Sequence, residues 1–218
     1  MSRSNLGPCT IALILAVSIP IVATAEQGDS EVGIRLLWTT GSATSTGTIA
    51  ETGSAVTLSS GPGVETGWVL WPLDELSVEL SLGLTGHPIK TRGGSLGGLD
   101  GGTLWRFPIS AVAQYRPKLT DRLDPYVGLG LVFNVLVPRM SSEYEQLLSD
   151  LDFTNELDVV AQAGLSYAID VRWSANLDLR YMGLRTTGTF VALDGSTLDE
   201  TVFKMNPWVV ALGFRFRY

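Results

Sequence analysis

The strongest constraint on this chain is a two-residue alternation of apolar side chains with small or polar ones. Between residues 173 and 180, Trp173, Ala175, Leu177 and Leu179 alternate with Ser174, Asn176, Asp178 and Arg180. The segments 76–85, 105–116 and 208–218 follow the same rule. Successive side chains of a β-strand point to opposite faces, whereas a helix repeats every 3.6 residues. The alternation therefore predicts an all-β fold.

Eight segments are predicted to be strands, and each is long enough to cross a bilayer at a tilt, which takes about ten residues. They are 31–40, 62–72, 75–87, 103–117, 124–137, 156–170, 172–186 and 203–218. The connections alternate between long and short, which is typical of an eight-stranded antiparallel up-and-down transmembrane β-barrel with long extracellular loops and short periplasmic turns. The long connections are 41–61, 88–102, 138–155 and 187–202, and the third is expected to hold a short amphipathic helix within 141–151.

Composition argues against disorder, because 45% of the residues are hydrophobic and only 17% are charged. The only long apolar run lies near the N-terminus, from Ile11 to Ala25, and Pro20 interrupts it. With Arg3 before it and small residues at its end, this run is typical of a secretory signal peptide cleaved after Ala25; the alternative is an N-terminal anchor helix. We therefore predict a signal peptide over 1–25 and one barrel over 26–218.

The uncharged apolar face of each strand is expected to point outward, toward lipid. These faces carry aromatic residues at both predicted ends, and two aromatic belts match the two interfaces of a bilayer. Trp38, Trp105 and Trp208 fall at the long-loop end, and Tyr115, Tyr167, Trp173 and Tyr218 at the short-turn end. An eight-stranded barrel also has a narrow interior, which suits small residues. The alternative is a secreted lipocalin-like barrel with its apolar face inside.

The last predicted strand ends on the aromatic residue Tyr218, with Phe216 and Phe214 at alternate positions before it. Such a strand resembles the recognition signal of the bacterial barrel-assembly machinery. These three residues are therefore predicted to bind that machinery, and the chain to lie in the outer membrane of a Gram-negative bacterium.

Several blocks of the sequence combine glycine, proline and aromatic residues in recognisable runs. They are Pro108-Ile-Ser-Ala-Val-Ala-Gln-Tyr115, Pro125-Tyr-Val-Gly-Leu-Gly-Leu131, Leu177-Asp-Leu-Arg-Tyr-Met182, and Asn206-Pro-Trp-Val209 with Leu212-Gly-Phe-Arg-Phe216. Together these blocks resemble the OmpW family of small outer-membrane barrels. The resemblance covers roughly residues 65–218 and is weak over the first strand and first loop. It implies an eight-stranded barrel, passive passage of small hydrophobic molecules, and no cofactor.

The inward-facing residues predict a lumen with two zones. A charged plug toward the periplasmic side is predicted from Arg35, Glu79, Arg116, Asp178, Arg180 and Arg215. A hydrophobic zone toward the outer side is predicted from Val69, Val112, Val132, Val160, Met182 and Val209. Isolated charges in a narrow, poorly hydrated lumen are costly, so the acids are expected to pair with neighbouring arginines.

The predicted charged plug would prevent a hydrophobic solute from passing straight through the barrel. A hydrophobic molecule would enter from the long-loop side and leave sideways into the bilayer through an opening in the wall. Because proline cannot donate to a strand ladder, Pro88, Pro108 and Pro138 are candidates for that opening. The expected behaviour is faster uptake of apolar solutes with little ion conductance.

Other functions have weaker support in the sequence. An enzyme acting on lipid A would need a serine and a base, and the single histidine, His87, precedes Pro88 without a neighbouring serine pattern. An acidic chain with formal net charge −7 argues against a nucleic-acid partner, and we predict neither a catalytic site nor a metal site. A structural or surface-binding barrel that acts through its extracellular loops stays the alternative.

Overall fold

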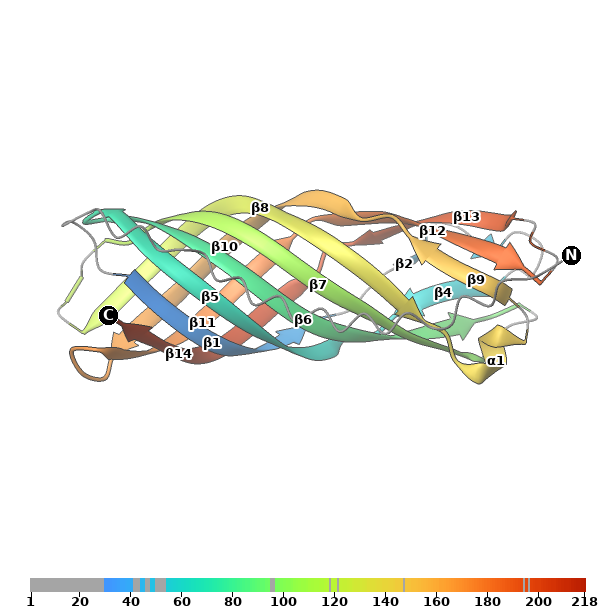
Figure 1. Cartoon of the computed structure of the whole chain (residues 1–218), viewed down its shortest axis with the longest axis horizontal. Coiled ribbons are helices and arrows are strands. Elements are labelled where there is room, and N and C mark those ends of the chain that lie inside the picture. The colour runs from blue at the N-terminus through green and yellow to red at the C-terminus, as the bar shows by residue number, and fades with distance from the viewer. Residues whose placement is uncertain are drawn as a thin grey trace, which may run out of the picture.

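The computed structural model describes residues 30–40, 44–45, 48–49, 54–94, 97–117, 119–120, 122–146, 148–193, 195 and 197–218. The predicted signal peptide lies outside the described residues. Within the described part of the chain, no helix is both long and apolar enough to span a membrane. The fold is a long cylinder of tilted strands (Figure 1).

Eight strands close the cylinder, as predicted from the alternation. They are β1 (Ser30–Thr39), β5 (Gly61–Leu73), β6 (Leu76–Arg92), β7 (Asp100–Tyr115), β8 (Leu123–Arg139), β10 (Glu156–Ala168), β11 (Trp173–Met182) and β14 (Trp208–Arg217). Each is antiparallel to its neighbours in the order β6-β5-β1-β14-β11-β10-β8-β7, and the pairing of β6 with β7 completes the ring. Closure leaves no unpaired sheet edge in this part of the molecule.

The predicted long loops are largely strand, and this part of the prediction was wrong. β6 and β7 continue through most of 88–102, and the other three regions contain further strands that prolong the cylinder. These are β2 (Thr44–Ser45), β3 (Thr48–Ile49), β4 (Ser54–Leu58), β9 (Leu148–Phe153), β12 (Leu184–Ala192) and β13 (Thr197–Met205). The expected helix shrinks to α1 (Ser142–Glu145), and β9 takes up its second half. Alternation within these segments, as in β12 with Leu184, Thr186 and Phe190 buried, explains the strands.

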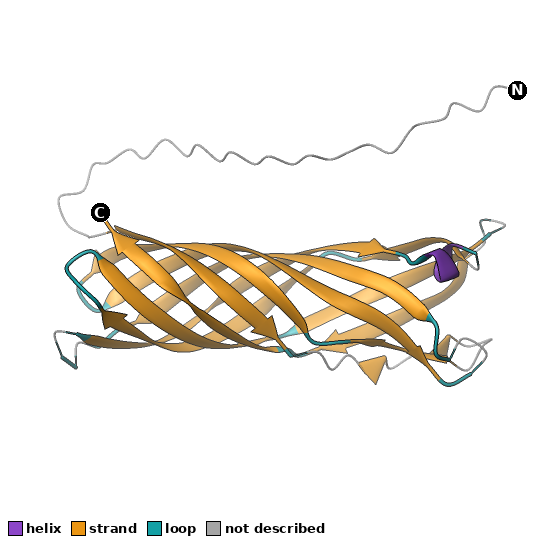
Figure 2. Cartoon of the chain, turned by 90° about the horizontal axis from the view of Figure 1, so that it is seen from below, coloured by secondary structure: helices purple, strands orange, loops and turns teal. Residues whose placement is uncertain are grey.

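The short connections and the extended strands mark two different ends, which we call the turn end and the loop end. The turn end holds Ser30 of β1, Arg217 of β14 and the connections 74–75, 116–122 and 169–172. The loop end holds α1 and the four-stranded sheet β2-β13-β12-β9. Figure 2 shows the two ends at opposite tips of the cylinder, with α1 at the loop end.

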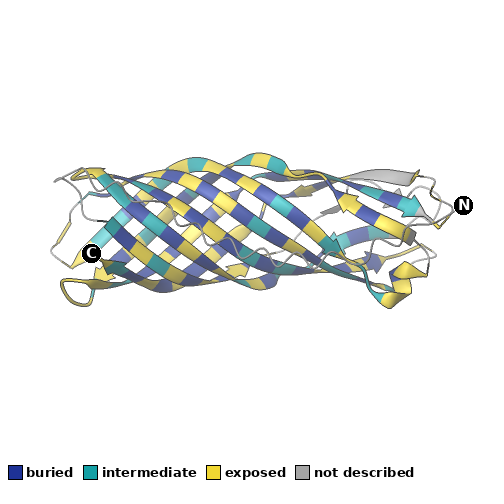
Figure 3. Cartoon of the chain, viewed as in Figure 1, coloured by how far each residue is buried: buried dark blue, intermediate teal, exposed yellow. Residues whose placement is uncertain are grey.

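The apolar faces point outward, as expected for a lipid-facing wall. Buried and exposed positions alternate along every barrel strand (Figure 3), and Ile34, Leu36 and Leu212 are all more than 60% exposed. All seven aromatic residues predicted to form the two belts are exposed on the outer surface. The soluble alternative, with the apolar face inside, is therefore excluded.

Candidate functional site

The inside of the barrel at its turn end is a charged cluster, which we call the plug. Six side chains form its ion pairs: Arg35, Arg180 and Arg215 with Glu65, Glu79 and Asp178. Three positive and three negative charges give a formal net charge of zero. All six are at most 5% exposed, so every charge is neutralised inside the protein and away from water.

Two residues connect the cluster most extensively. Arg35 donates to Glu65, Glu79 and Asp178, with its Nη1 2.6 Å from Asp178 Oδ2. Glu79 accepts from Arg35, from Arg180 Nη2 at 3.0 Å and from Arg215 Nη2 at 2.7 Å. Five strands, β1, β5, β6, β11 and β14, are thereby joined across the lumen. Neutral donors complete the network: Gln114, Gln162, Tyr126 and Asn176 each donate to Glu79 or Asp178.

Glu65 belongs to the plug but was missed from the sequence. It lies four residues before Val69 in β5, so both side chains face the lumen, and that spacing was the available signal. Gly63 and Gly67 on the same face weaken the alternation there, which hid Glu65.

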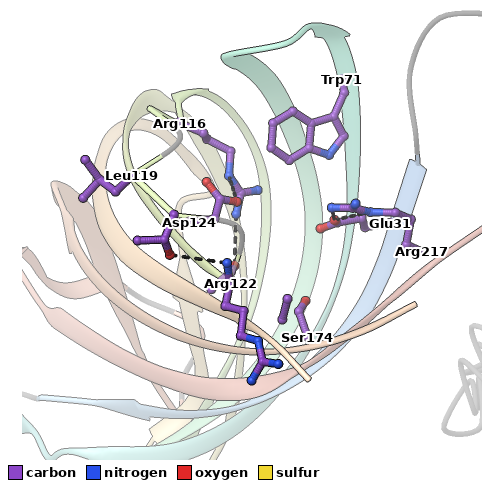
Figure 4. A pocket seen from close by; sticks show the side chains of 11 residues that line it. Glu31, Trp71, Arg116, Leu119, Arg122, Asp124, Ser174 and Arg217 are labelled. Carbon is purple, nitrogen blue, oxygen red and sulfur yellow. Dashed lines mark hydrogen bonds and ion pairs between the residues drawn. The ribbon is translucent and has the colours of Figure 1, made fainter. Parts of the chain in front are cut away.

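Arg116 lies below the plug, at the mouth of the turn end. Its guanidinium stacks on the rings of Trp71 and Tyr126 and forms an ion pair with Asp124 at 3.1 Å. Figure 4 shows the surrounding pocket, where Arg217 pairs with Glu31 on the opposite wall. This cavity has a volume of about 430 Å³, and the plug separates it from the rest of the lumen.

Above the plug lies an apolar layer, which we call the apolar girdle. It consists of Leu37, Val112, Val132, Val160, Met182, Val209 and Ala211. Five of the six predicted hydrophobic-lumen residues are in it, but the assignment of Val69 to the outer half was wrong. Val69 pairs with Glu31 and with Glu79, so it lies at the level of the plug. Strand β5 runs from the loop end to the turn end, and Val69 is close to its turn-end terminus.

A second apolar cluster fills the loop end, beyond the exposed tryptophans, and we call it the outer core. Its buried members include Ile89, Leu104, Leu136, Phe153, Phe190 and Phe203. Phe153 and Phe203 pack with ring centroids 5.5 Å apart. Polar and apolar side chains therefore alternate in zones along single strands. On β8 the inward order is Tyr126, which donates to the plug, then Val132, Asn134 and Leu136.

Of the three prolines proposed to open the wall, Pro108 lies where two ladder pairs are missing. Pro88 pairs with Thr103, one residue before a register shift at Ile89/Lys90, and Pro138 pairs with Leu104. Between β6 and β7, the pairs run to Leu82↔Ile109 and resume in the same register at Thr85↔Arg106. Among the described residues, Gly83 and Leu84 pair with Glu65 and Val64 on β5 but have no ladder partner on β7, opposite Pro108 and Phe107. Gly83 also faces the Pro108 ring, which a Cβ there would approach to 3.0 Å.

His87 lies inside the barrel with both ring nitrogens engaged. Nε2 is 3.1 Å from Thr85 Oγ1, and Nδ1 is 3.0 Å from the carbonyl oxygen of Ser59. On β14, the side chains of Phe214 and Tyr218 are exposed, and Phe216 packs edge-on against Trp173 at 5.1 Å. No group of three metal-ligating side chains occurs among the residues that the structure describes.

A closed eight-stranded antiparallel wall with an apolar outer face and a charged interior defines an outer-membrane β-barrel. Comparison with known proteins identifies the family: the model of the OmpW family matches residues 37–218, and the chain belongs to this family. Outer membrane protein W of Vibrio cholerae is 31% identical over 136 residues, which cover 60% of this chain and 62% of that protein. Outer membrane protein W of Escherichia coli is 28% identical over 148 residues, covering 66% of this chain and 68% of its own.

The crystal structure of OprG from Pseudomonas aeruginosa has the same fold, with a TM-score of 0.76 at 19% sequence identity. The alignment covers 88% of this chain and 96% of OprG. The chain is therefore located in the outer membrane of a Gram-negative bacterium. The turn end is the expected periplasmic end and the loop end the expected extracellular end, because short turns face the periplasm in such barrels.

Proposed function

We propose that the barrel passes small hydrophobic molecules from the outer side into the membrane, through the apolar girdle and a lateral opening in the wall. The observation that carries this proposal is the interrupted ladder at Pro108. Pro108 itself is buried and faces the lumen between Arg106 and Ser110, opposite Asn134 and four residues above Val112 of the apolar girdle. The opening would therefore lie just above the apolar girdle, between it and the polar side chains around Arg106.

The plug supports a sideways route rather than a straight one. A neutral, fully paired network that joins five strands leaves an apolar solute no favourable path into the periplasm, because entering it would break buried ion pairs. Transfer from water into the apolar girdle and then into lipid is favourable at each step. The same seal predicts little ion conductance.

The experiment compares Pro108→Val with Pro88→Val in vesicles whose outer leaflet is lipopolysaccharide. Valine restores a backbone N–H, so Pro108→Val should allow the ladder to close and should slow uptake of an apolar fluorescent probe by about tenfold. Pro88→Val is the matched control, since Pro88 already pairs with Thr103 across the same two strands. Equal uptake by the two variants, or steady single-channel currents that vanish in Glu79→Ala, would contradict the proposal.

One observation favours the alternative, a structural or surface-binding barrel. The outer core gives the extracellular part a packed interior of its own, as a rigid binding surface requires. Shortening the connection between β12 and β13 while scoring adhesion and solute uptake separately distinguishes the two functions. Loss of adhesion with normal uptake would favour surface binding.

Two further expectations belong to this proposal. The exposed Phe214 and Tyr218, together with Phe216, are proposed to be recognised by the barrel-assembly machinery. We also propose that the chain is not an enzyme. The imidazole of His87 is held by Thr85 and a carbonyl oxygen, so His87→Ala should leave the composition of lipid A unchanged.

A further inference from the structure

A polar layer separates the apolar girdle from the outer core, and its centre is Arg106. This guanidinium is 1% exposed, donates through Nε to Asn134 Oδ1 at 2.7 Å, and places Nη2 2.9 Å from the thioether sulfur of Met182. Both partners are neutral, and sulfur is a weak acceptor. Within the described residues, Arg106 has no ion pair, unlike each arginine of the plug.

The groups around Arg106 are short of an acceptor. The amide nitrogen of Asn134, Nδ2, is buried without a hydrogen-bond partner, and so is the hydroxyl of Thr39. Arg106 and Thr39 line one small cavity together with Leu58, Met205 and Pro207. Its volume is about 10 Å³, enough for a single oxygen-sized group. Arg106 and Thr39 thus meet at this cavity, with the Asn134 amide beside Arg106, and none of the residues lining the cavity is a carboxylate.

Two neighbouring groups do not fill this role. His87 also lines the cavity, but Thr85 and the Ser59 carbonyl occupy its ring nitrogens. Asp158 is half-buried, and its Oδ2 atom is buried without a hydrogen-bond partner, but among the described residues it forms no ion pair with Arg106. The buried positive charge therefore remains without a contacting counter-charge.

The depth of this layer in the membrane gives the missing group a chemical identity. Arg106, Thr39 and Pro207 are each the sequence neighbour of an exposed tryptophan: Trp105, Trp38 and Trp208. These tryptophans form the outer aromatic belt, which lies where hydrocarbon meets headgroups. Arg106 is also two residues from Pro108, where the ladder is interrupted.

We propose that Arg106, with Asn134 and Thr39, binds the carboxylate head of an amphipathic solute such as a medium-chain alkyl carboxylate. This inference rests on the proposed function and names one class of its solutes. The head displaces whatever occupies the small cavity, and the tail lies along the apolar girdle beside Pro108. A solute leaving through the wall there keeps its head at interface depth while its tail enters hydrocarbon, so the carboxylate is never desolvated without a partner.

The test is a titration of the detergent-solubilised full chain with [1-¹³C]decanoate at pH 8, where the acid is ionised, and in parallel with 1-decanol. Arg106→Met removes the charge and keeps much of the side-chain length, so decanoate binding should weaken by about tenfold or more, with decanol unchanged. Arg106→Lys should restore part of the preference. Unchanged decanoate affinity in Arg106→Met, or an equal loss for decanol, would overturn the proposal.

If Arg106→Met does not fold, Asp158→Asn provides a second test of the binding site. Removing this nearby negative charge should tighten binding of decanoate and leave decanol unchanged, and the absence of that change would count against the site. Uptake of decanol into vesicles tests the proposed function separately. Specific decanoate binding without decanol uptake would remove the transport proposal alone, and decanol uptake without Arg106-dependent binding would remove this site alone.

Discussion

Glu79→Gln tests directly whether the plug is a desolvated, charge-balanced network. Glu79 contacts three arginines, and its loss leaves three positive charges against two carboxylates. Arg35 and Arg180 keep Glu65 as a partner. Among the described residues, Arg215 loses its only carboxylate and keeps two weaker contacts, to Ser166 Oγ at 3.3 Å and to Tyr126 Oη at 3.4 Å.

The magnitude follows from the burial of the pair. Removing one partner of a buried ion pair destabilises a protein by about 3–5 kcal/mol, because an uncompensated charge remains. Glutamine still accepts hydrogen bonds, so we expect the lower end, a fall of about 3 kcal/mol in the free energy of unfolding. The matched control is Glu31→Gln, whose partner Arg217 has a 44% exposed side chain, and which should cost about 0–1 kcal/mol.

Urea unfolding of the barrel from phospholipid vesicles, followed by tryptophan fluorescence, measures both variants. The double variant Glu79→Gln/Arg215→Met restores neutrality and should recover part of the loss, so the two substitutions should be clearly non-additive. If Glu79→Gln were no more destabilising than Glu31→Gln, the plug would be hydrated. A hydrated plug would not block straight passage of a solute into the periplasm, and this result would refute the sideways route.

Two other substitutions test single features of the structure. Gly164→Ala places a Cβ 2.4 Å from the ring of Tyr126, so it should displace the ring, break its hydrogen bond to Asp178 and lower stability by about 1–3 kcal/mol, measured by the same unfolding assay. In the periplasmic turn, the backbone N–H of Arg172 donates to Asp170 and lowers the pKa of that carboxyl group. The ionised Asp170 carboxylate therefore stabilises the fold at pH values above its ordinary pKa, and this stabilisation is lost as the pH falls through the lowered pKa. Asp170→Ala should destabilise the protein at pH 7 but much less at pH 3. An equal effect at the two pH values would contradict this.

The barrel was predictable because the polar residues of the two-residue alternation are also the residues whose side chains are buried in the lumen. In β11, Asp178 and Arg180 face the lumen, whereas Leu177 and Leu179 face lipid, as the sequence predicted. The predicted loops failed for a related reason. A strand that leaves the membrane no longer needs an apolar outer face, so β12 and β13 show threonines and charges outside and a mixed interior. The lipid-facing pattern that marks the transmembrane strands is absent there.

The pairing within the lumen could be predicted only in outline. The acids were expected to pair with arginines. Which residues meet depends on the tilt of the strands and on the stagger of their register around the barrel, and neither can be read from one strand alone. Val69 was misplaced for another reason: β5 runs toward the turn end, and Val69 lies four residues before the end of that strand, paired with Glu79 of the plug. Arg106 was not singled out either, because its neighbours in sequence are Trp105 and Phe107, and its isolation from carboxylates exists only in three dimensions.

The arginines of this barrel fall into two groups, and the contrast bears on passage. Arg35, Arg180 and Arg215 are neutralised by contact at the turn end, where a rigid floor requires low mobility and no net field. Arg106 is equally buried but has only neutral partners, beside the proposed opening. If burial of arginine served stability alone, Arg106 would be expected to contact a carboxylate as the other four buried arginines do, because an unpaired buried charge is strongly destabilising. An unneutralised guanidinium beside the proposed opening is what selection among apolar solutes by their head groups would require.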